Sequence, residues 1–138
     1  MAIEDPLTYK VIGCAMEVHK TLGNGFQEVI YQRCLAIELR RAQISFLREV
    51  EQPIYYKDEA VGTRRADFII EGQLVIELKA VIKLEDVHLA QAKNYLSAYN
   101  FETGLLINFG SASMEYKRIF RSHKSSKSLN PDYPDADS

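Results

Sequence analysis

The 138-residue sequence has no tryptophan, only two cysteines and no long apolar run. Because a membrane-spanning helix needs roughly 20 apolar residues, we expect no contact with a membrane. Neither a basic stretch nor an apolar signal segment follows Met1, so the sequence predicts a cytoplasmic protein. Cys14 and Cys34 stand far apart and form no CxxC pair, which favours reduced thiols in apolar helices.

An excess of positive charge is also absent. The chain has 17 Lys and Arg against 19 Asp and Glu, a formal net charge of −2 and a pI near 5.9. It therefore lacks the positive field that binds duplex DNA by charge alone, and any contact with nucleic acid must be local. With 46% hydrophobic residues, the length fits one globular domain. We place it at residues 1–121, followed by a flexible tail at residues 122–138 whose basic half could lie along nucleic acid.

Two short apolar runs joined by a glycine-containing turn occupy residues 64–80. Apolar residues recur at every second position of both runs, as expected for a β-hairpin with one buried face. A two-residue turn would set Asp67 opposite Leu78 and mix the two faces. The pattern therefore predicts an odd-length connection, such as residues 71–73, or a bulge.

With that register, the carboxylates of Asp67 and Glu77 lie directly opposite each other on the second face. Cross-strand Cβ atoms are about 4.5–5.5 Å apart, so these like charges repel unless a cation lies between them. Mg²⁺ prefers oxygen ligands, and two carboxylates, a nearby backbone carbonyl such as that of Leu78, and waters would suffice. Lys79, on the face of Glu77, can hold an activated water or the charge of a phosphoryl transition state.

The spacing of Asp67 and Glu77-Leu78-Lys79 resembles the D…ExK signature of the PD-(D/E)XK nuclease superfamily. Two further segments agree, since residues 25–31 read GxxExxY and residues 91–95 read QxxxY. Together they resemble the small GxxExxY proteins, a branch that shares QxxxY with RecB-type exonuclease domains. The resemblance covers roughly Val11 to Phe120 and implies an α/β fold with an αβββαβ restriction-endonuclease-like core, a mixed sheet flanked by helices.

The resemblance also implies a function, a divalent-metal-dependent nuclease that hydrolyses phosphodiester bonds, with DNA favoured over RNA. Mg²⁺, replaceable by Mn²⁺, would be held by Asp67, Glu77, the Leu78 carbonyl and Glu28. The catalytic residues implied are Asp67, Glu77, Lys79, Glu28 and Gln91, and the substrate-binding residues are Tyr95, Arg65, His88 and Tyr31. Some RecB-type relatives carry a four-cysteine iron–sulfur cluster, which two cysteines cannot supply, so we expect none.

Several of these residues also have an ordinary structural explanation. Glu28 suits a helix N-terminus, where an acid stabilises by about 0.3–1 kcal/mol. Arg65 shares the face of Asp67 by strand parity and could pair with a carboxylate or reach a phosphate. Tyr31 could pack and orient the site through its hydroxyl, Tyr95 could belong to the core, and Gln91 could be a surface amide.

Apolar spacing predicts the remaining elements. We expect helices at residues 7–22, 26–42 and 85–99, and strands at residues 44–57, 64–70, 74–80, 104–110 and 116–120, with a turn at residues 57–62. The second helix should bury Ile30, Cys34, Ile37 and Ala36 or Leu39. Residues 104–110 are apolar throughout, as in a central parallel strand. Pro53 removes a donor and predicts a bulge or an edge strand.

Two other functions remain open from the sequence. The chain could be a catalytically inactive nuclease-like domain that serves as a nucleic-acid-binding or complex-assembly subunit, which its net acidity favours. The acids and Lys79 could also form only a salt-bridge ladder on a structural sheet. A nuclease of this size could act as a homodimer to engage two strands.

Overall fold

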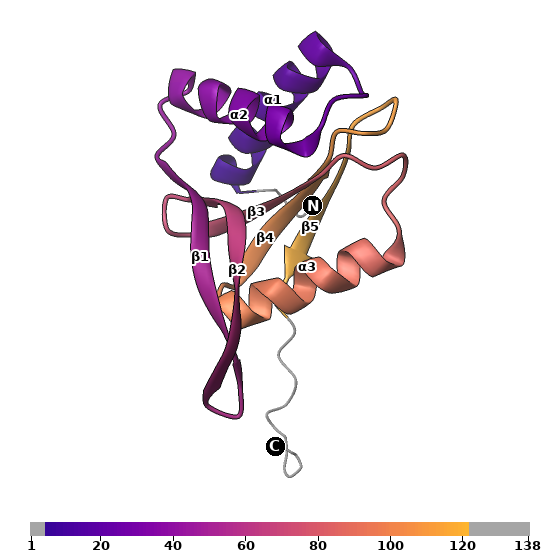
Figure 1. The fold of residues 1–138 in the computed structure, drawn as a ribbon. Helices are drawn as coiled ribbons and strands as arrows, with labels where there is room; N and C mark the ends of the chain where they lie inside the picture. Colours follow the sequence, from indigo (N-terminus) through magenta and orange to yellow (C-terminus); the bar gives the residue numbers. More distant parts are fainter. Residues whose placement is uncertain (1–4, 122–138) are drawn as a thin grey trace.

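A computed structural model describes residues 5–121 and contains a five-stranded mixed sheet flanked by three helices (Figure 1). The elements are α1 (Pro6–Leu22), α2 (Glu28–Arg41), β1 (Phe46–Tyr56), β2 (Glu59–Ile70), β3 (Leu74–Lys79), α3 (Asp86–Tyr99), β4 (Thr103–Asn108) and β5 (Glu115–Phe120). This order confirms the predicted α/β fold and its αβββαβ core. The predicted tail at residues 122–138 lies outside the described residues.

The strands lie in the order β1-β2-β3-β4-β5, with β3 and β4 parallel and the other neighbours antiparallel. Residues 104–108 of β4 are all buried, which confirms the predicted central parallel strand. Helices α1 and α2 cover one face of the sheet, where they pack on Phe68, Ile76 and Ile107. Helix α3 covers the other face, where Leu96 packs with Val75 (Figure 1).

Helix α2 buries only part of the stripe that we predicted. Ala36 and Leu39 are fully buried as expected, but Ile30 and Cys34 are only partly buried. Ile37 is 46% exposed, whereas Leu35 and Leu39 are fully buried with Tyr31. These three residues are four apart and form one stripe toward α1 and the sheet. The periodicity was visible in the sequence, but the rotation of the helix depends on what it packs against. No helix within residues 5–121 combines the length and apolarity that a bilayer span requires.

The β1–β2 hairpin is long and turns more tightly than expected. Tyr56 already pairs with Glu59, and both turn residues, Lys57 and Asp58, have positive φ (47° and 72°). A two-residue turn of this kind matches the twist of the strands, so the predicted turn at residues 57–62 is wrong in length. Strand β1 is an edge strand, as Pro53 predicted. The pairing register with β2 shifts just after Pro53, between Ile54 and Tyr55.

The β2–β3 connection confirms the predicted three-residue turn. Ile70 pairs with Leu74, and residues 71 and 72 have positive φ (50° and 67°). The ladder contains three residue pairs and ends at Phe68 and Ile76. One further step of the same register would pair Asp67 with Glu77. The two strands therefore separate at the position that the sequence marks as the site.

Candidate active site

The side chain of Asp67 lies where the β2–β3 ladder stops. Its Oδ2 accepts a hydrogen bond from the Leu78 N–H (2.8 Å), and its Oδ1 accepts one from Nε2 of Gln32 on α2 (2.8 Å). The carboxylate thus accepts from the Leu78 N–H of β3 in the way that a backbone carbonyl of a paired strand would. The Leu78 N–H is therefore a backbone partner of Asp67, and the Leu78 carbonyl stays a predicted metal ligand.

The regular alternation of β2 also fails at this point. Ala66 and Ile69 pack beneath α3, whereas Phe68 packs beneath α1 and α2. Residues three apart lie on opposite faces of a regular strand, so β2 must be irregular between Ala66 and Ile69. The neighbouring strand is irregular at the same point. Glu49 of β1, between Arg48 and Val50, which pair with Phe68 and Ala66, has a positive φ of 55°. Asp67 points between the strands, which differs from the predicted placement on one regular face with Glu77.

Glu77 is a buried acid with an incomplete set of partners. Glu77 is only 5% exposed, and its Oε1 accepts a hydrogen bond from Nη2 of Arg64 at 2.9 Å. Its Oε2 is buried and makes no hydrogen bond of ordinary geometry, although the nearby Tyr99 hydroxyl, which also lacks such a bond, interacts with the carboxylate and lowers its pKa. Burial first, and the negative charge of Asp67 second, raise the pKa of Glu77 to about 8, although Arg64 and Lys79 oppose the rise. Such a carboxylate is costly unless a cation compensates it.

Arg64 is the site residue that the sequence reasoning missed. Its guanidinium lies 4.2 Å from the ring centroid of Tyr95 and pairs with Glu77. The predicted Arg65 instead has a largely exposed side chain and pairs with Glu49 at 3.5 Å, which is the carboxylate alternative. The choice of Arg65 assumed regular strand parity, which the break at Asp67 invalidates. The one hint of Arg64 in the sequence was its position next to the predicted Arg65.

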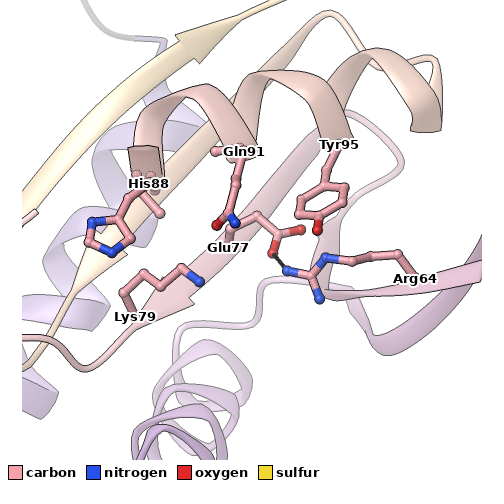
Figure 2. Close-up of a pocket in the computed structure, with 8 residues that line it drawn as sticks. Arg64, Glu77, Lys79, His88, Gln91 and Tyr95 are labelled. Carbon is pink, nitrogen blue, oxygen red and sulfur yellow. Dashed lines mark hydrogen bonds and ion pairs between the residues drawn. The ribbon is translucent and has the colours of Figure 1, made fainter. Parts of the chain in front are cut away.

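A small pocket between β3 and α3 gathers most of the other predicted residues. It is lined by Arg64, Glu77, Lys79, His88, Gln91, Ala92, Tyr95 and Leu106. Figure 2 shows the Lys79 amine extending toward Glu77 and the Gln91 amide, with the Tyr95 ring over Arg64. Gln91 and Tyr95 lie one helical turn apart on α3, so both face the pocket. The structure therefore brings Glu77, Lys79 and the QxxxY residues together.

His88 lines this pocket but also has a structural role. Its Nδ1 accepts a hydrogen bond from the Glu85 N–H at 2.9 Å, and the Glu85 side chain in turn accepts from the His88 N–H. This reciprocal pair caps the N-terminus of α3. The contact holds the imidazole at the pocket rim.

Glu28 and Tyr31 of the GxxExxY segment have different environments. Partial burial and the charge of Asp67 raise the pKa of Glu28, while Lys79 and Arg64 lower it, so Glu28 belongs to the same charged cluster. Tyr31 is fully buried, stacks on Phe109 at 4.6 Å and donates its hydroxyl hydrogen to the Gly23 carbonyl. The prediction that Tyr31 binds substrate is therefore wrong, and the packing alternative holds.

The acids fit a hard divalent cation in their chemistry. Glu28, Asp67 and Glu77 offer only oxygen donors, which Mg²⁺ and Mn²⁺ accept, and one buried oxygen of Glu77 makes no hydrogen bond of ordinary geometry. Across residues 5–121, however, no three His, Cys, Asp or Glu side chains are grouped closely enough to hold a metal ion. Gln32 and the Leu78 N–H engage Asp67, and Arg64 engages Glu77. If these partners moved away, the carboxylates of Asp67 and Glu77 would be free to bind a cation.

The fold and the site define an α/β protein with the architecture of a nuclease. A family model described as the PD-(D/E)XK nuclease superfamily matches residues 5–119, and the chain belongs to this superfamily. Its members generally use divalent metals. No curated protein matches the chain at a significant level.

Two solved structures are similar in fold. One, titled "Crystal structure of SSO0001", is 22% identical, with a TM-score of 0.56 over 72% of this chain and 52% of its own. This chain therefore spans about half the length of that protein. The other, an alkaline exonuclease (LHK-Exo) from Laribacter hongkongensis, is 8% identical, with a TM-score of 0.50 over 88% of this chain and 73% of its own. Both are consistent with the predicted restriction-endonuclease-like fold.

Proposed function

We propose that this chain is a divalent-metal-dependent nuclease that hydrolyses phosphodiester bonds of DNA. One observation supports the proposal above all. In a chain of the PD-(D/E)XK superfamily, Glu77 keeps a buried carboxylate oxygen that makes no hydrogen bond of ordinary geometry, in a charged cluster with Asp67 and Lys79. We also propose that the chain belongs to the GxxExxY branch, on the motifs at residues 25–31 and 91–95. A cytoplasmic location and a homodimer stay predictions.

The residues of the cluster suggest a division of labour. Asp67 and Glu77, assisted by Glu28, would hold Mg²⁺, or Mn²⁺ in its place. The bound ion would supply Lewis-acid stabilisation of the phosphoryl oxygens and lower the pKa of a bound water. Lys79 would hold the attacking water and neutralise charge that develops on the phosphoryl group.

The α3 side of the pocket would bind and orient. Gln91 would orient the water or the Lys79 amine, since both side chains line the same pocket. Tyr95 and His88 would contact the substrate backbone at the pocket rim. Positive charge at the pocket comes from Lys79 and Arg64, so the negative net charge of the chain does not prevent local binding of a phosphate.

Cleavage of assorted DNA and RNA with Mg²⁺ or Mn²⁺ tests the proposal. Wild type should cleave, chelation by EDTA should stop cleavage, and Asp67→Ala and Lys79→Ala should lose it. Lys93→Ala is a matched control, because Lys93 is an exposed lysine of α3 outside the pocket. Equal activity in all variants would indicate a contaminating nuclease and contradict the proposal.

A non-catalytic binding or assembly subunit is the second candidate, favoured by the net charge of −2. Calorimetric titration with Mn²⁺ separates the two functions. Binding by wild type that Glu77→Ala abolishes supports the nuclease. Absence of both metal binding and cleavage in wild type, with nucleic acid still bound, supports the subunit.

A further inference from the structure

The ion pair between Arg64 and Glu77 is only half formed. Nη2 of Arg64 contacts Oε1 of Glu77 at 2.9 Å, while Nε of Arg64 and Oε2 of Glu77 are both buried and make no hydrogen bond of ordinary geometry. The other terminal nitrogen, Nη1, reaches only the neighbouring Arg65 carbonyl at 3.4 Å. A permanent arginine–carboxylate pair is often bidentate and uses two nitrogens and two oxygens. This pair leaves one donor and one acceptor unused.

The guanidinium also has a second support that does not depend on Glu77. It lies 4.2 Å from the Tyr95 ring centroid, a distance at which a cation is attracted to the face of an aromatic ring. At Arg64, strand β2 pairs with β1 through Gln52, whereas its pairing with β3 begins only at Phe68. The Tyr95 ring would therefore still hold the guanidinium in the pocket if its ion pair with Glu77 broke. The strand that carries Arg64 is paired there on the β1 side only, which leaves the side chain room to move away from Glu77.

Charge favours such an exchange. The cluster contains three carboxylates, on Glu28, Asp67 and Glu77, and two cations, Arg64 and Lys79, and each carboxylate interacts electrostatically with both cations. With all groups ionised it is formally negative by one charge. A divalent cation changes this to an excess of one positive charge, which repels Arg64 from Glu77 and attracts a phosphate.

We propose that Arg64 is an internal counter-ion that occupies Glu77 in the metal-free protein and transfers to a substrate phosphate when a divalent cation binds. This inference rests on the proposed function. Arg64 would then oppose metal binding and favour nucleic-acid binding. A residue that only supports the fold would weaken both when it is replaced.

Calorimetry with Mn²⁺ alone tests the first half. Arg64→Gln should bind Mn²⁺ about tenfold more tightly than wild type, because the guanidinium no longer competes for Glu77 or repels the ion. Arg65→Gln, which changes the adjacent exposed arginine, should match wild type within about twofold. Unchanged or weaker binding by Arg64→Gln, with wild type binding normally, overturns this inference and leaves the nuclease proposal standing. No binding by wild type overturns both.

Oligonucleotide binding tests the second half, in a Lys79→Ala background that prevents cleavage. With Mn²⁺ present, adding Arg64→Gln should weaken binding of a labelled DNA oligonucleotide about tenfold by fluorescence anisotropy, whereas adding Arg65→Gln should change it at most twofold. Equal affinities in the Arg64→Gln and Arg65→Gln backgrounds would overturn the transfer to phosphate.

A measurement on wild type avoids any effect of the variants on folding. The Nε–H of Arg64 is buried, so its resonance in an arginine-selective ¹H–¹⁵N spectrum should exchange slowly with water. Addition of Mg²⁺ should shift that resonance and leave that of Arg65 in place. An Arg64 signal that stays fixed while Mg²⁺ binds would show that the pair persists and would overturn the exchange.

Discussion

Two polar side chains are buried on the adjacent parallel strands β3 and β4, and they differ in how their polar atoms are used. Asn108 on β4 is fully buried, and its Oδ1 accepts from the Val81 and Gly110 N–H groups at 2.9 and 3.0 Å. Its Nδ2 donates to the Val81 carbonyl and to Glu115, both at 2.9 Å. Glu77 on β3 has Arg64 as the partner of one oxygen, while its other oxygen makes no hydrogen bond of ordinary geometry.

The carboxylate of Glu115, which contacts Asn108, shows the same contrast with that of Glu77. Hydrogen bonds from the Asn108 side chain and the Leu84 N–H lower the pKa of Glu115, whereas burial raises that of Glu77. Buried polar groups are normally satisfied, so the Asn108 network stabilises the fold, whereas Glu77 is the less satisfied of the two groups and the candidate to bind a cation. The comparison predicts that replacing Asn108 lowers the stability of the fold and that replacing Glu77 lowers the activity.

The largest effect should follow from Glu77→Gln. Removing the carboxylate charge should lower kcat of Mg²⁺-dependent cleavage by about 10³-fold, because the cation loses a ligand. The melting temperature measured in EDTA above pH 8, where Glu77 is charged in the folded protein, should stay equal or rise, since a costly buried charge is gone. Steady-state cleavage and thermal unfolding measure the two effects. Glu115→Gln is the matched control, and an equal loss of cleavage there would break the comparison.

Asn108→Ala should have the opposite outcome. It leaves several backbone groups near residues 81 and 110 without partners, so the free energy of unfolding should fall by about 3 kcal/mol. Urea denaturation followed by circular dichroism measures this change. A loss below about 1 kcal/mol would mean that the Asn108 network contributes no more than an ordinary surface contact.

The pH dependence of stability should sharpen the contrast. The pKa of Glu77 is raised from 4.5 to about 8 in the folded protein, so between these values the folded state holds a proton that the unfolded state has released. Stability in EDTA should therefore fall as pH rises through this window, by up to about 5 kcal/mol, and level off above it. Denaturation of wild type and Glu77→Gln in parallel should show a slope that the variant lacks. Equal slopes would contradict the assignment of the proton to Glu77.

The smallest effect is expected at Tyr31. Tyr31→Phe keeps the stacked ring but removes the hydroxyl contacts with the Gly23 carbonyl and the Phe26 N–H, which should cost about 1 kcal/mol of stability. Cleavage by the folded variant should match wild type, because the side chain is buried away from the pocket. A rise in KM for nucleic acid would instead restore Tyr31 as a substrate contact.

The order of elements and the hairpin were predictable because they depend on local patterns. Alternating apolar residues and the glycine at position 72 specified the strands and the three-residue turn. The burial stripe of α2 was predictable only in part. Ala36 and Leu39 were expected to be buried, but tertiary packing brings Leu35, rather than Ile37, against the core. Periodicity sets which residues share a face, but tertiary contacts select the face.

The site was predictable to the extent that it follows from regular structure. Glu77 and Lys79 share a face of β3, and Gln91 and Tyr95 share a face of α3, so all four meet in the pocket. Arg64 was missed because parity cannot be extended through an irregular strand. The break depends on the bonds that the Asp67 carboxylate makes with Gln32 and the Leu78 N–H, which only the folded chain brings together.

X-ray diffraction from a crystal soaked with Mn²⁺ tests the central claim most directly. The account predicts an anomalous peak in contact with carboxylate oxygens of both Asp67 and Glu77, with the Arg64 guanidinium moved away from Glu77 and still against Tyr95. An empty site at a saturating Mn²⁺ concentration, with Asp67 still bound to Gln32 and Glu77 still paired with Arg64, would contradict it.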